Sequence, residues 1–470
     1  MKDTNIKNNK KKIKFDAFVI IFFVIIFCYL LSLVIPSGEF VREEVNGRSV
    51  VVANSFHETE KIYLKPWAIF QSVPNGLTAS ASMMFVVMMV AGCIEIYQST
   101  KSIDMVMVSL LKKSEKVGSQ TILILIMIAF GCIGGFLGWN EQIVPFIPII
   151  ISLCLAMGYD VMVGIACSAM IDMISFSVSP SSVYTVGISH EIAQLPMFSG
   201  FAFRLALLVI FDTVIIIYVL RYAKKVKANP ENSLMLGIDD SEFRVDYSQI
   251  MDQKMTTNQK VAMIVFLLTF IVAIAGVSSF GWSMNDLGAA FFFLGIAGGA
   301  ICSMNINEVI DGFITGAKKG LGPALVIGLA RAIQWILSEG GVIDPIINFL
   351  SKPLAQMGAY ATPIVVMVII SLFNGLITSG SAKATALMPI LIPLADLVGM
   401  SRQTMILAFQ FGDGLTNVLW FTSGTLLMFL TIAKIPLNRW YKFVWKLMVI
   451  LTVLSIIAMM VAIKINYGPF

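Results

Sequence analysis

Ionisable and amide side chains interrupt an otherwise apolar stretch from 375 to 425 in this 470-residue chain. Lys383, Asp413 and Asn417 lie there, beside two hydroxyl-rich segments, Ser-Gly-Ser-Ala and Thr-Ser-Gly-Thr, that break the apolar runs. Ionisable groups are costly at membrane depth, and irregular backbone is tolerated there only where it is buried in protein or lines a watery cavity. The stretch therefore indicates a binding site for a polar solute or an ion.

A second stretch, from 134 to 184, repeats this pattern earlier in the chain. Adding 241 to the residue number carries Asp172 to Asp413 and Ser182 to Ser423. We interpret the two stretches as copies of one repeat, each with two polar breaks.

The four breaks are predicted to converge on one site, because free N–H groups at helix N-termini suit anions and free carbonyl groups suit small cations. The candidate substrate- or ion-binding residues lie at or beside the breaks: Asn140, Glu141, Asp172, Ser181, Ser182, Ser379, Ser381, Lys383, Asp413, Asn417, Thr422 and Ser423. Arg331, in the apolar run from 325 to 337, is a candidate charge partner. Glu95, Arg204 and Asp212 lie in or beside apolar runs but away from the breaks, so we rank them lower.

These charged residues also have structural interpretations. Glu141 could lie at a solvated hairpin tip, and Lys383 and Arg331 could serve only to neutralise Asp413 or Asp172. The two aspartates occupy equivalent positions within apolar segments, where an unpaired carboxylate needs a proton or a cation. We therefore expect both aspartates to act in ion coupling or in recognition of substrate charge.

The composition is that of a polytopic membrane protein, because 57% of residues are hydrophobic, 13% are charged and the mean hydropathy is +0.86. Basic residues gather at predicted membrane edges, so the net charge of +5 indicates orientation rather than binding to nucleic acid. Two histidines and six dispersed cysteines do not form a zinc-site pattern. We predict no metal or organic cofactor and leave coupling to Na⁺ or H⁺ open.

Apolar runs predict an all-α membrane protein built from two inverted-topology repeats with re-entrant hairpins and broken helices. The predicted membrane segments are 18–35, 80–97, a hairpin of 121–138 and 143–157, then 160–178, 203–220, 260–277, 287–302, 325–337 and 443–462. The inversion is indicated by equivalent loops with unequal numbers of Lys and Arg, because the loop before 203 has none whereas its counterpart has three, and the basic loop 98–118 has a counterpart with one. Whether each hairpin is re-entrant or spanning is not decided by sequence.

The predicted parts of the chain are a cytoplasmic tail (1–16), a first half (17–222, with repeat 1 at about 78–222), a flexible cytoplasmic linker (223–257) and a second half (258–470, with repeat 2 at about 318–465). The segment from 36 to 76 is mixed in charge and β-tending, with a hairpin turn expected at Asn46-Gly47, and we place it outside. The N-terminus is predicted to be cytoplasmic.

The runs Ser379-Gly-Ser-Ala, Met388-Pro-Ile-Leu-Ile-Pro-Leu-Ala-Asp-Leu-Val-Gly and Ala408-Phe-Gln-Phe-Gly-Asp-Gly-Leu-Thr-Asn resemble the YfcC/DcuC family of bacterial carriers. The resemblance extends to Phe198-Ser-Gly-Phe-Ala-Phe-Arg and Gly328-Leu-Ala-Arg-Ala, and so covers nearly the whole chain. It implies a carrier of the bacterial inner membrane with inverted repeats, within the wider ion-transporter superfamily. Members are assigned to C4-dicarboxylates or, in the YfcC branch, to basic amino acids in exchange.

Two departures from the family pattern bear on the substrate. The second hairpin reads Ser379-Gly-Ser-Ala-Lys, which is similar to the aminobenzoyl-glutamate carriers, and the second break of the first repeat reads Ser179-Pro-Ser-Ser where Asn-Pro is expected.

We therefore predict a secondary active transporter, not an enzyme, that works by alternating access. Its predicted substrate is a carboxylate or a small amino acid, and a basic amino acid would be moved by exchange. The alternatives are a C4-dicarboxylate carrier, an ion channel and an intramembrane aspartyl protease. The pairs Tyr159-Asp160 and Gly412-Asp413 superficially resemble the two membrane aspartates of such a protease. The expected partners are a small-molecule substrate and the lipid bilayer, without nucleic acid, and a homodimer is compatible with the sequence.

Overall fold

The computed structural model describes residues 17–45, 48–52, 55–144, 146–245, 252–280, 282–351 and 357–468. Helices dominate this part of the chain, and seven of its helices are long and apolar enough to cross a membrane. The predicted class, an all-α polytopic membrane protein, is confirmed. The predicted tail, 1–16, lies outside the described residues.

The chain begins with α1 (Ala17–Val34), which matches the first predicted span. Two small antiparallel sheets follow, and they pair β1 (Gly38–Glu39) with β4 (His57–Glu58) and β2 (Arg42–Val45) with β3 (Arg48–Val51). The β2–β3 pairing confirms the predicted hairpin, whose two turn residues lie outside the described residues.

Helix α2 (Ala68–Ala79) differs from expectation, because the sequence analysis placed a β-tending segment as far as 76. This helix packs on α13 (Ile306–Glu339) through Gly76. A Cβ atom there would lie 2.5 Å from the carbonyl oxygen of Gly328, so only glycine allows the approach. The contact is between segments far apart in sequence, and local patterning does not reveal it.

Each repeat is built from the same series of elements. The first contains α3 (Ala81–Ser99), α4 (Ser102–Val117), α5 (Ser119–Cys132) with η1 (Ile133–Leu137), η2 (Glu141–Ile143), α6 (Phe146–Ala156), the continuous run α7 (Val161–Ile165), η3 (Ala166–Met170), α8 (Ile171–Ser175) and η4 (Phe176–Val178), then η5 (Val183–Gly187), α9 (Ile188–Ile192) and α10 (Phe201–Ala228). The second contains α13, α14 (Ile343–Ser351), α15 (Thr362–Asn374), α16 (Gly380–Leu397), α17 (Arg402–Thr416), α18 (Gly424–Ile432) and α19 (Leu437–Lys464). Between them lie α11 (Thr257–Ser279) and α12 (Met284–Ile301), which match two predicted spans.

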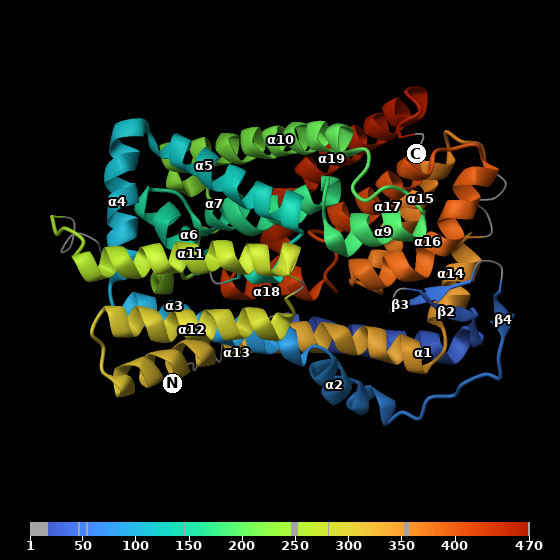
Figure 1. Ribbon diagram of the computed structural model, residues 1–470, viewed down its shortest axis with the longest axis horizontal. Coiled ribbons are helices and arrows are strands. Elements are labelled where there is room, and N and C mark those ends of the chain that lie inside the picture. The colour runs from blue at the N-terminus through green and yellow to red at the C-terminus, as the bar shows by residue number, and fades with distance from the viewer. Residues whose placement is uncertain are drawn as a thin grey trace, which may run out of the picture.

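The offset of 241 found in the sequence also relates the bounds of these elements. It carries the last residue of α6, Ala156, to the last residue of α16, Leu397, and the first residue of α7, Val161, to the first residue of α17, Arg402. Equivalent helices lie at opposite ends of the molecule, as α4 and α14 show in Figure 1. The repeats are therefore inverted.

The hairpins are re-entrant because one arm of each is short. Helix α6 has 11 residues and α15 has 13, which correspond to about 16 Å and about 20 Å at ~1.5 Å per residue. The hydrocarbon core of a bilayer is about 30 Å thick. Both hairpin tips consequently lie within the depth of the molecule.

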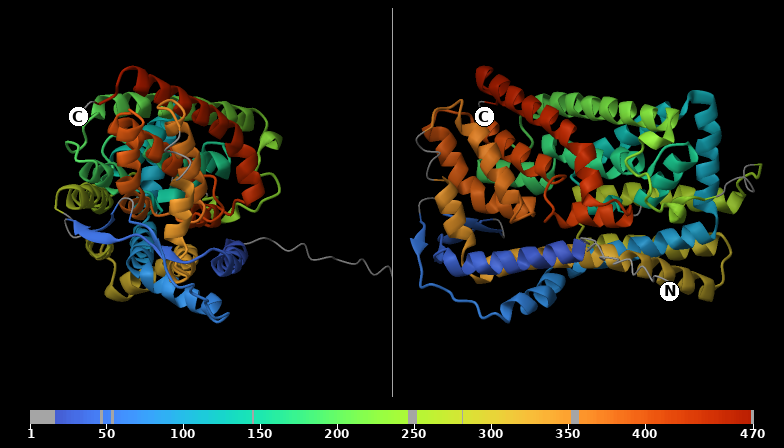
Figure 2. Two further views of the ribbon diagram at one scale, coloured as in Figure 1. Left: turned by 90° about the vertical axis from the view of Figure 1, so that its right-hand side faces the viewer. Right: turned by 180° about the vertical axis from the view of Figure 1, so that it is seen from behind.

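The helices form three layers along the long axis (Figures 1 and 2). Helices α1, α2, α3, α12 and α13 make one outer layer, α10 and α19 lie on the opposite side, and the hairpins with the broken helices lie between them. Helix α16 packs against α9 and η5, whereas α6 packs against α18. Each hairpin thus contacts the second break of the other repeat.

The connector between the halves is packed rather than flexible over its described part. Met235 and Phe243 are buried. Asp160, which caps α7, accepts hydrogen bonds from the Tyr222 and Ser233 hydroxyl groups, each at 2.6 Å. Since α10 continues to Ala228, the connector begins later than the predicted boundary at 222.

Candidate functional site

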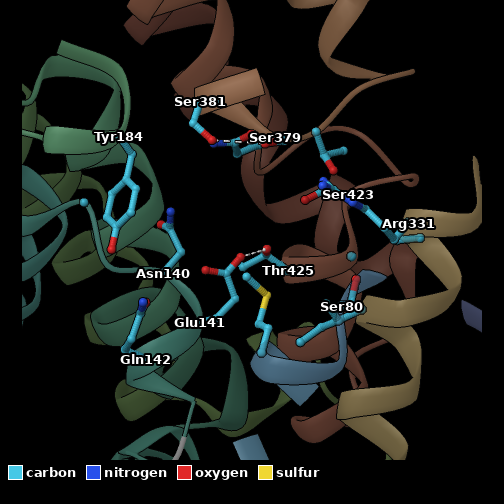
Figure 3. A pocket seen from close by; sticks show the side chains of 18 of the residues that line it. Ser80, Asn140, Glu141, Gln142, Tyr184, Arg331, Ser379, Ser381, Ser423 and Thr425 are labelled. Atoms are coloured by element: carbon cyan, nitrogen blue, oxygen red, sulfur yellow. Dashed lines mark hydrogen bonds between the residues drawn. The ribbon is translucent and has the colours of Figure 1, made fainter. Parts of the chain in front are cut away.

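A cavity of about 380 Å³ lies between the two hairpin tips and the second breaks (Figure 3). Its volume is in the range of pockets for small organic ligands. Its polar lining comes from both repeats and from Ser80, which follows α2: Ser80, Ser82, Asn140, Glu141, Gln142, Tyr184, Arg331, Thr378, Ser379, Ser381, Asp413, Asn417, Ser423 and Thr425.

The structure brings most of the predicted site residues together at this cavity. Those that line it are Asn140, Glu141, Ser379, Ser381, Asp413, Asn417, Ser423 and the charge partner Arg331. Asp172, Ser181, Ser182, Lys383 and Thr422 lie outside the lining. The role of each residue in binding stays a prediction.

Two of the residues outside the lining hold the broken backbone in shape. The hydroxyl group of Ser181 donates to the carbonyl oxygen of Phe136 at 2.9 Å, and that of Thr422 donates to the carbonyl oxygen of Gly375 at 2.7 Å. Each bond ties a second break to the hairpin of its own repeat. In both repeats the hairpin and the break therefore form one connected unit.

Two helix N-termini open onto the cavity. Ser379 caps α16 by accepting from the N–H of Ala382, and Ser423 caps α18 by accepting from the N–H of Leu426. The residues that follow each cap, Gly380-Ser381 and Gly424-Thr425, are part of the cavity wall. Uncapped N–H groups and the positive end of the helix dipole favour a carboxylate at such places.

One acid and one base in the cavity wall have no ion pair among the described residues. Glu141 accepts a hydrogen bond of 2.6 Å from the hydroxyl group of Thr425, which is neutral. Arg331 extends from α13 toward Ser423 (Figure 3). The cavity therefore presents a free negative charge and a free positive charge to a bound solute.

The second acid in the wall, Asp413, is already neutralised. Its carboxylate forms an ion pair with Lys383, and both side chains are almost completely buried. The ammonium group also donates to the Oδ1 atom of Asn374, whose Nδ2 atom donates to the carbonyl oxygen of Asp413 and to Oδ1 of Asn417, each at 2.9 Å. The pair is thus fixed within a hydrogen-bonded network.

Asp172, the equivalent of Asp413, lies behind the wall. It is fully buried, and its α8 backbone packs against η1, where a Cβ atom on Gly134 would lie 2.0 Å from the Asp172 carbonyl oxygen. The adjacent Met173 and Phe176 reach the cavity instead. The expectation that both aspartates lie at the same centre is met by Asp413 alone.

Several residues with a structural role at the site were ranked low or not singled out from the sequence. Arg204 is fully buried and donates to Oε1 of Gln410, whose Nε2 atom donates to the carbonyl oxygens of Phe176 and Ser179 at 3.0 and 3.1 Å. These bonds fix the second break of the first repeat. The partners are about 200 residues apart, and neither position is marked by the repeat.

Comparison with known proteins assigns the family. Residues 16–464 match the model of the DcuC family, described as C4-dicarboxylate anaerobic carrier. The chain belongs to the DcuC family. It is thus a multi-pass membrane transporter, and the predicted resemblance is confirmed.

Two curated relatives align with this DcuC-family chain over almost their whole length. It is 28% identical over 495 residues to the Escherichia coli (strain K12) protein named "Putative basic amino acid antiporter YfcC", with 96% of this chain and 97% of that protein covered. It is 27% identical over 508 residues to an uncharacterized protein of Haemophilus influenzae, with 97% and 99% covered.

Among solved structures, the YdaH transporter of Alcanivorax borkumensis aligns with a TM-score of 0.45 and 14% identity over 96% of this chain and 100% of that chain. MtrF of Neisseria gonorrhoeae, which its description places in a class of antimetabolite efflux pumps, aligns with a TM-score of 0.44 and 14% identity over 96% and 95%.

Proposed function

We propose that this DcuC-family transporter carries a small amino acid across the bacterial inner membrane by alternating access between its inverted repeats. One observation supports this most strongly: Glu141 and Arg331 line the same cavity, and neither has an ion pair among the described residues. A zwitterion carries one charge of each sign. A zwitterion would pair with both side chains at once, whereas a solute without charged groups would leave both charges unpaired at membrane depth.

The carboxylate of the amino acid is assigned to the side of the cavity that holds Arg331 and the N-terminus of α18. Ser423 caps that helix, and the Arg331 side chain extends toward it (Figure 3). A guanidinium group and backbone N–H groups are the donors that recognise carboxylates in proteins. The amino group is assigned to Glu141, with the amide of Asn140 beside it (Figure 3).

A C4-dicarboxylate is the second candidate, and the charges of the cavity fit it less well. Two carboxylates would need a second cationic partner. Lys383 is the nearest candidate, but it is fully buried and already paired with Asp413. Glu141 would in addition repel the second carboxylate.

A basic amino acid moved by exchange agrees with the name of the Escherichia coli relative. Its second positive charge would need acceptors beyond Glu141. The side-chain oxygens of Asn417 and Tyr184 lie in the same wall and can accept hydrogen bonds from such a group. We therefore place basic amino acids first among the substrates to test.

The protease alternative requires two aspartates at one centre, and the positions of Asp160 and Asp413 argue against it. Asp160 caps the start of the run from 161 to 178, whose 18 residues extend about 27 Å at ~1.5 Å per residue toward the break. Both Asp160 oxygens accept hydrogen bonds from structural partners.

Counterflow in proteoliposomes tests this proposal. Vesicles loaded with unlabelled solute should take up labelled arginine or ornithine, and uptake should saturate. Labelled succinate should give no counterflow. Selective counterflow of succinate would replace the amino acid with a dicarboxylate, and single-channel currents without saturable counterflow would assign the chain to the channels.

A further inference from the structure

The two equivalent aspartates differ in how their charge is balanced. Asp413 is paired with Lys383, and Asn374 holds that ammonium group. The offset of 241 carries Gln142 to Lys383 and Ile133 to Asn374. The first repeat therefore has a neutral amide and an alkyl group where the second repeat has its cation and the acceptor that orients it.

Asp172 is left without a cation in the interior of the protein. It is 0% exposed, and neither carboxylate oxygen has a hydrogen-bond donor among the described residues. Ser175, which lies in the same helix as Asp172, contacts a second acid, Asp212. An ionised carboxylate in such surroundings is costly unless a positive charge joins it.

The elements around α8 do not supply that positive charge. The titratable or charged groups of the elements packed on α8 are Cys132 at the end of α5, Cys167 in η3, Arg204, Asp212 and the basic and tyrosine residues from Tyr218 onward in α10, and Arg402 and Asp413 in α17. Arg402 begins α17, and the basic residues of α10 from Arg221 onward lie in its last turns, away from Asp212. Arg204 donates to the neutral Gln410, and Lys383, which neutralises Asp413, is committed to that pair. Acids therefore dominate the surroundings of Asp172.

Asp212 lies in close contact with Ser175, whose hydroxyl group has two acceptor oxygens within reach. The Ser175 hydroxyl oxygen lies 2.7 Å from the Ile171 carbonyl oxygen and 2.6 Å from Oδ1 of Asp212. A serine hydroxyl has one hydrogen to donate. In the second repeat the equivalent hydroxyl of Thr416 donates to the equivalent carbonyl oxygen, that of Gly412, at 2.8 Å.

If Ser175 donates in the same way, the short contact to Asp212 needs a hydrogen on the Asp212 carboxyl group. The site is confined as well, because a Cβ atom on Gly131 would lie 2.5 Å from the other Asp212 oxygen. Helix α19, the equivalent of α10, contains no Asp or Glu. The second repeat thus has no acid equivalent to Asp212, and its aspartate, Asp413, is paired with a cation.

We propose that Asp172 and Asp212 form a proton-binding site that couples proton movement to transport, and that Lys383 is a built-in cation filling the equivalent place in the second repeat. The coupling rests on the proposed function. Met173, the residue after Asp172, lines the same cavity as Glu141, so an ammonium group bound at Glu141 adds positive charge close to Asp172 and favours loss of the Asp172 proton to water. Substrate binding and proton binding then oppose each other, as an exchanger requires.

Infrared difference spectroscopy of the purified protein without substrate tests the proton site alone. At neutral pH the wild type should show the deuterium-sensitive carbonyl band of a protonated carboxyl group. The band should weaken in Asp172→Asn and in Asp212→Asn and remain in Asp311→Asn, which removes an exposed acid of α13. A band unchanged in both site variants, or absent from the wild type, would overturn the proposal.

Proton flux in proteoliposomes tests the coupling. With arginine as the probe, the wild type should move protons against arginine in a fixed ratio, and that ratio should fall to zero in Asp172→Asn whatever the rate of exchange. An unchanged ratio in Asp172→Asn, or coupling to Na⁺ with no proton flux, would contradict it. If the wild type moves no arginine while the infrared band behaves as expected, the proposed substrate is wrong and the proton site stands.

Discussion

The ammonium group of Lys383 forms an ion pair with the carboxylate of Asp413, and the two side chains are 0% and 1% exposed. This pair joins the hairpin of the second repeat to its broken helix. Asp413 lines, and Lys383 lies behind, the wall of a cavity in which Glu141 and Arg331 have no ion pair among the described residues. A neutral wall with two free charges of opposite sign is the arrangement from which the amino-acid substrate is inferred.

Lys383→Met should destabilise the protein, because it leaves Asp413 buried and uncompensated. Loss of one partner of a buried pair costs roughly 3–5 kcal/mol. Thermal denaturation of the purified protein should show a lower midpoint than the wild type, and Lys383→Met combined with Asp413→Asn should recover most of the difference. Wild-type stability of Lys383→Met alone would mean that Asp413 does not depend on this lysine.

Arg331→Gln should weaken the recognition of the substrate carboxylate without unfolding the protein. A hydrogen bond to a charged group contributes about 1.5–3 kcal/mol, so the KM for arginine should rise about tenfold or more. Lys318→Gln, a similar loss of charge at an exposed position of the same helix, is the matched control. Equal KM values for the two variants would remove Arg331 from the site.

Glu141→Gln separates the two substrate classes. A glutamine oxygen can still accept the hydrogen bond from Thr425, so the shape of the site is kept while its negative charge is lost. The KM for an amino acid should rise by a factor of about ten or more. If transport of succinate improves while that of amino acids is unaffected, the amino group has been assigned wrongly.

Gly134→Ala should be severely destabilising, because its Cβ atom would lie 2.0 Å from the Asp172 carbonyl oxygen. Overpacking of this kind costs about 1–3 kcal/mol or more. Gly288→Ala in α12 is the control, since the nearest atoms to a Cβ there are 3.7 Å away. Yields of folded protein after detergent extraction should fall for the first variant only, and equal yields would show that the hairpin can shift at no cost.

The internal repeat made much of this fold predictable from sequence. The match of Asp172 with Asp413 and of Ser182 with Ser423 located both hairpins and both second breaks, and the Lys and Arg content of equivalent loops indicated the inversion. Composition and apolar run length then placed α1, α11 and α12 within a few residues. These features depend on local patterning and on chain symmetry, which a single sequence contains.

Contacts across the repeats were not accessible in the same way. The hydrogen bonds of Gln410 to the break at Ser179 and of Ser175 to Asp212 join residues that are far apart in sequence and that the repeat does not relate to each other. The symmetry also does not show that Asp413 lines the cavity whereas Asp172 lies outside its lining. Equivalent positions share a similar backbone, but the second repeat has Lys383 where the first has Gln142. The two aspartates therefore have different charged neighbours.

A competition series of matched ligands tests the central claim most directly. Counterflow of labelled arginine would be measured against arginine, its methyl ester, which lacks the carboxylate charge, and its des-amino analogue, which lacks the α-amino group. If Arg331 and Glu141 bind a zwitterion, arginine should compete strongly and both analogues should compete at least about tenfold more weakly. Equal competition by the des-amino analogue, or strong competition by succinate, would contradict recognition of an amino acid in this cavity.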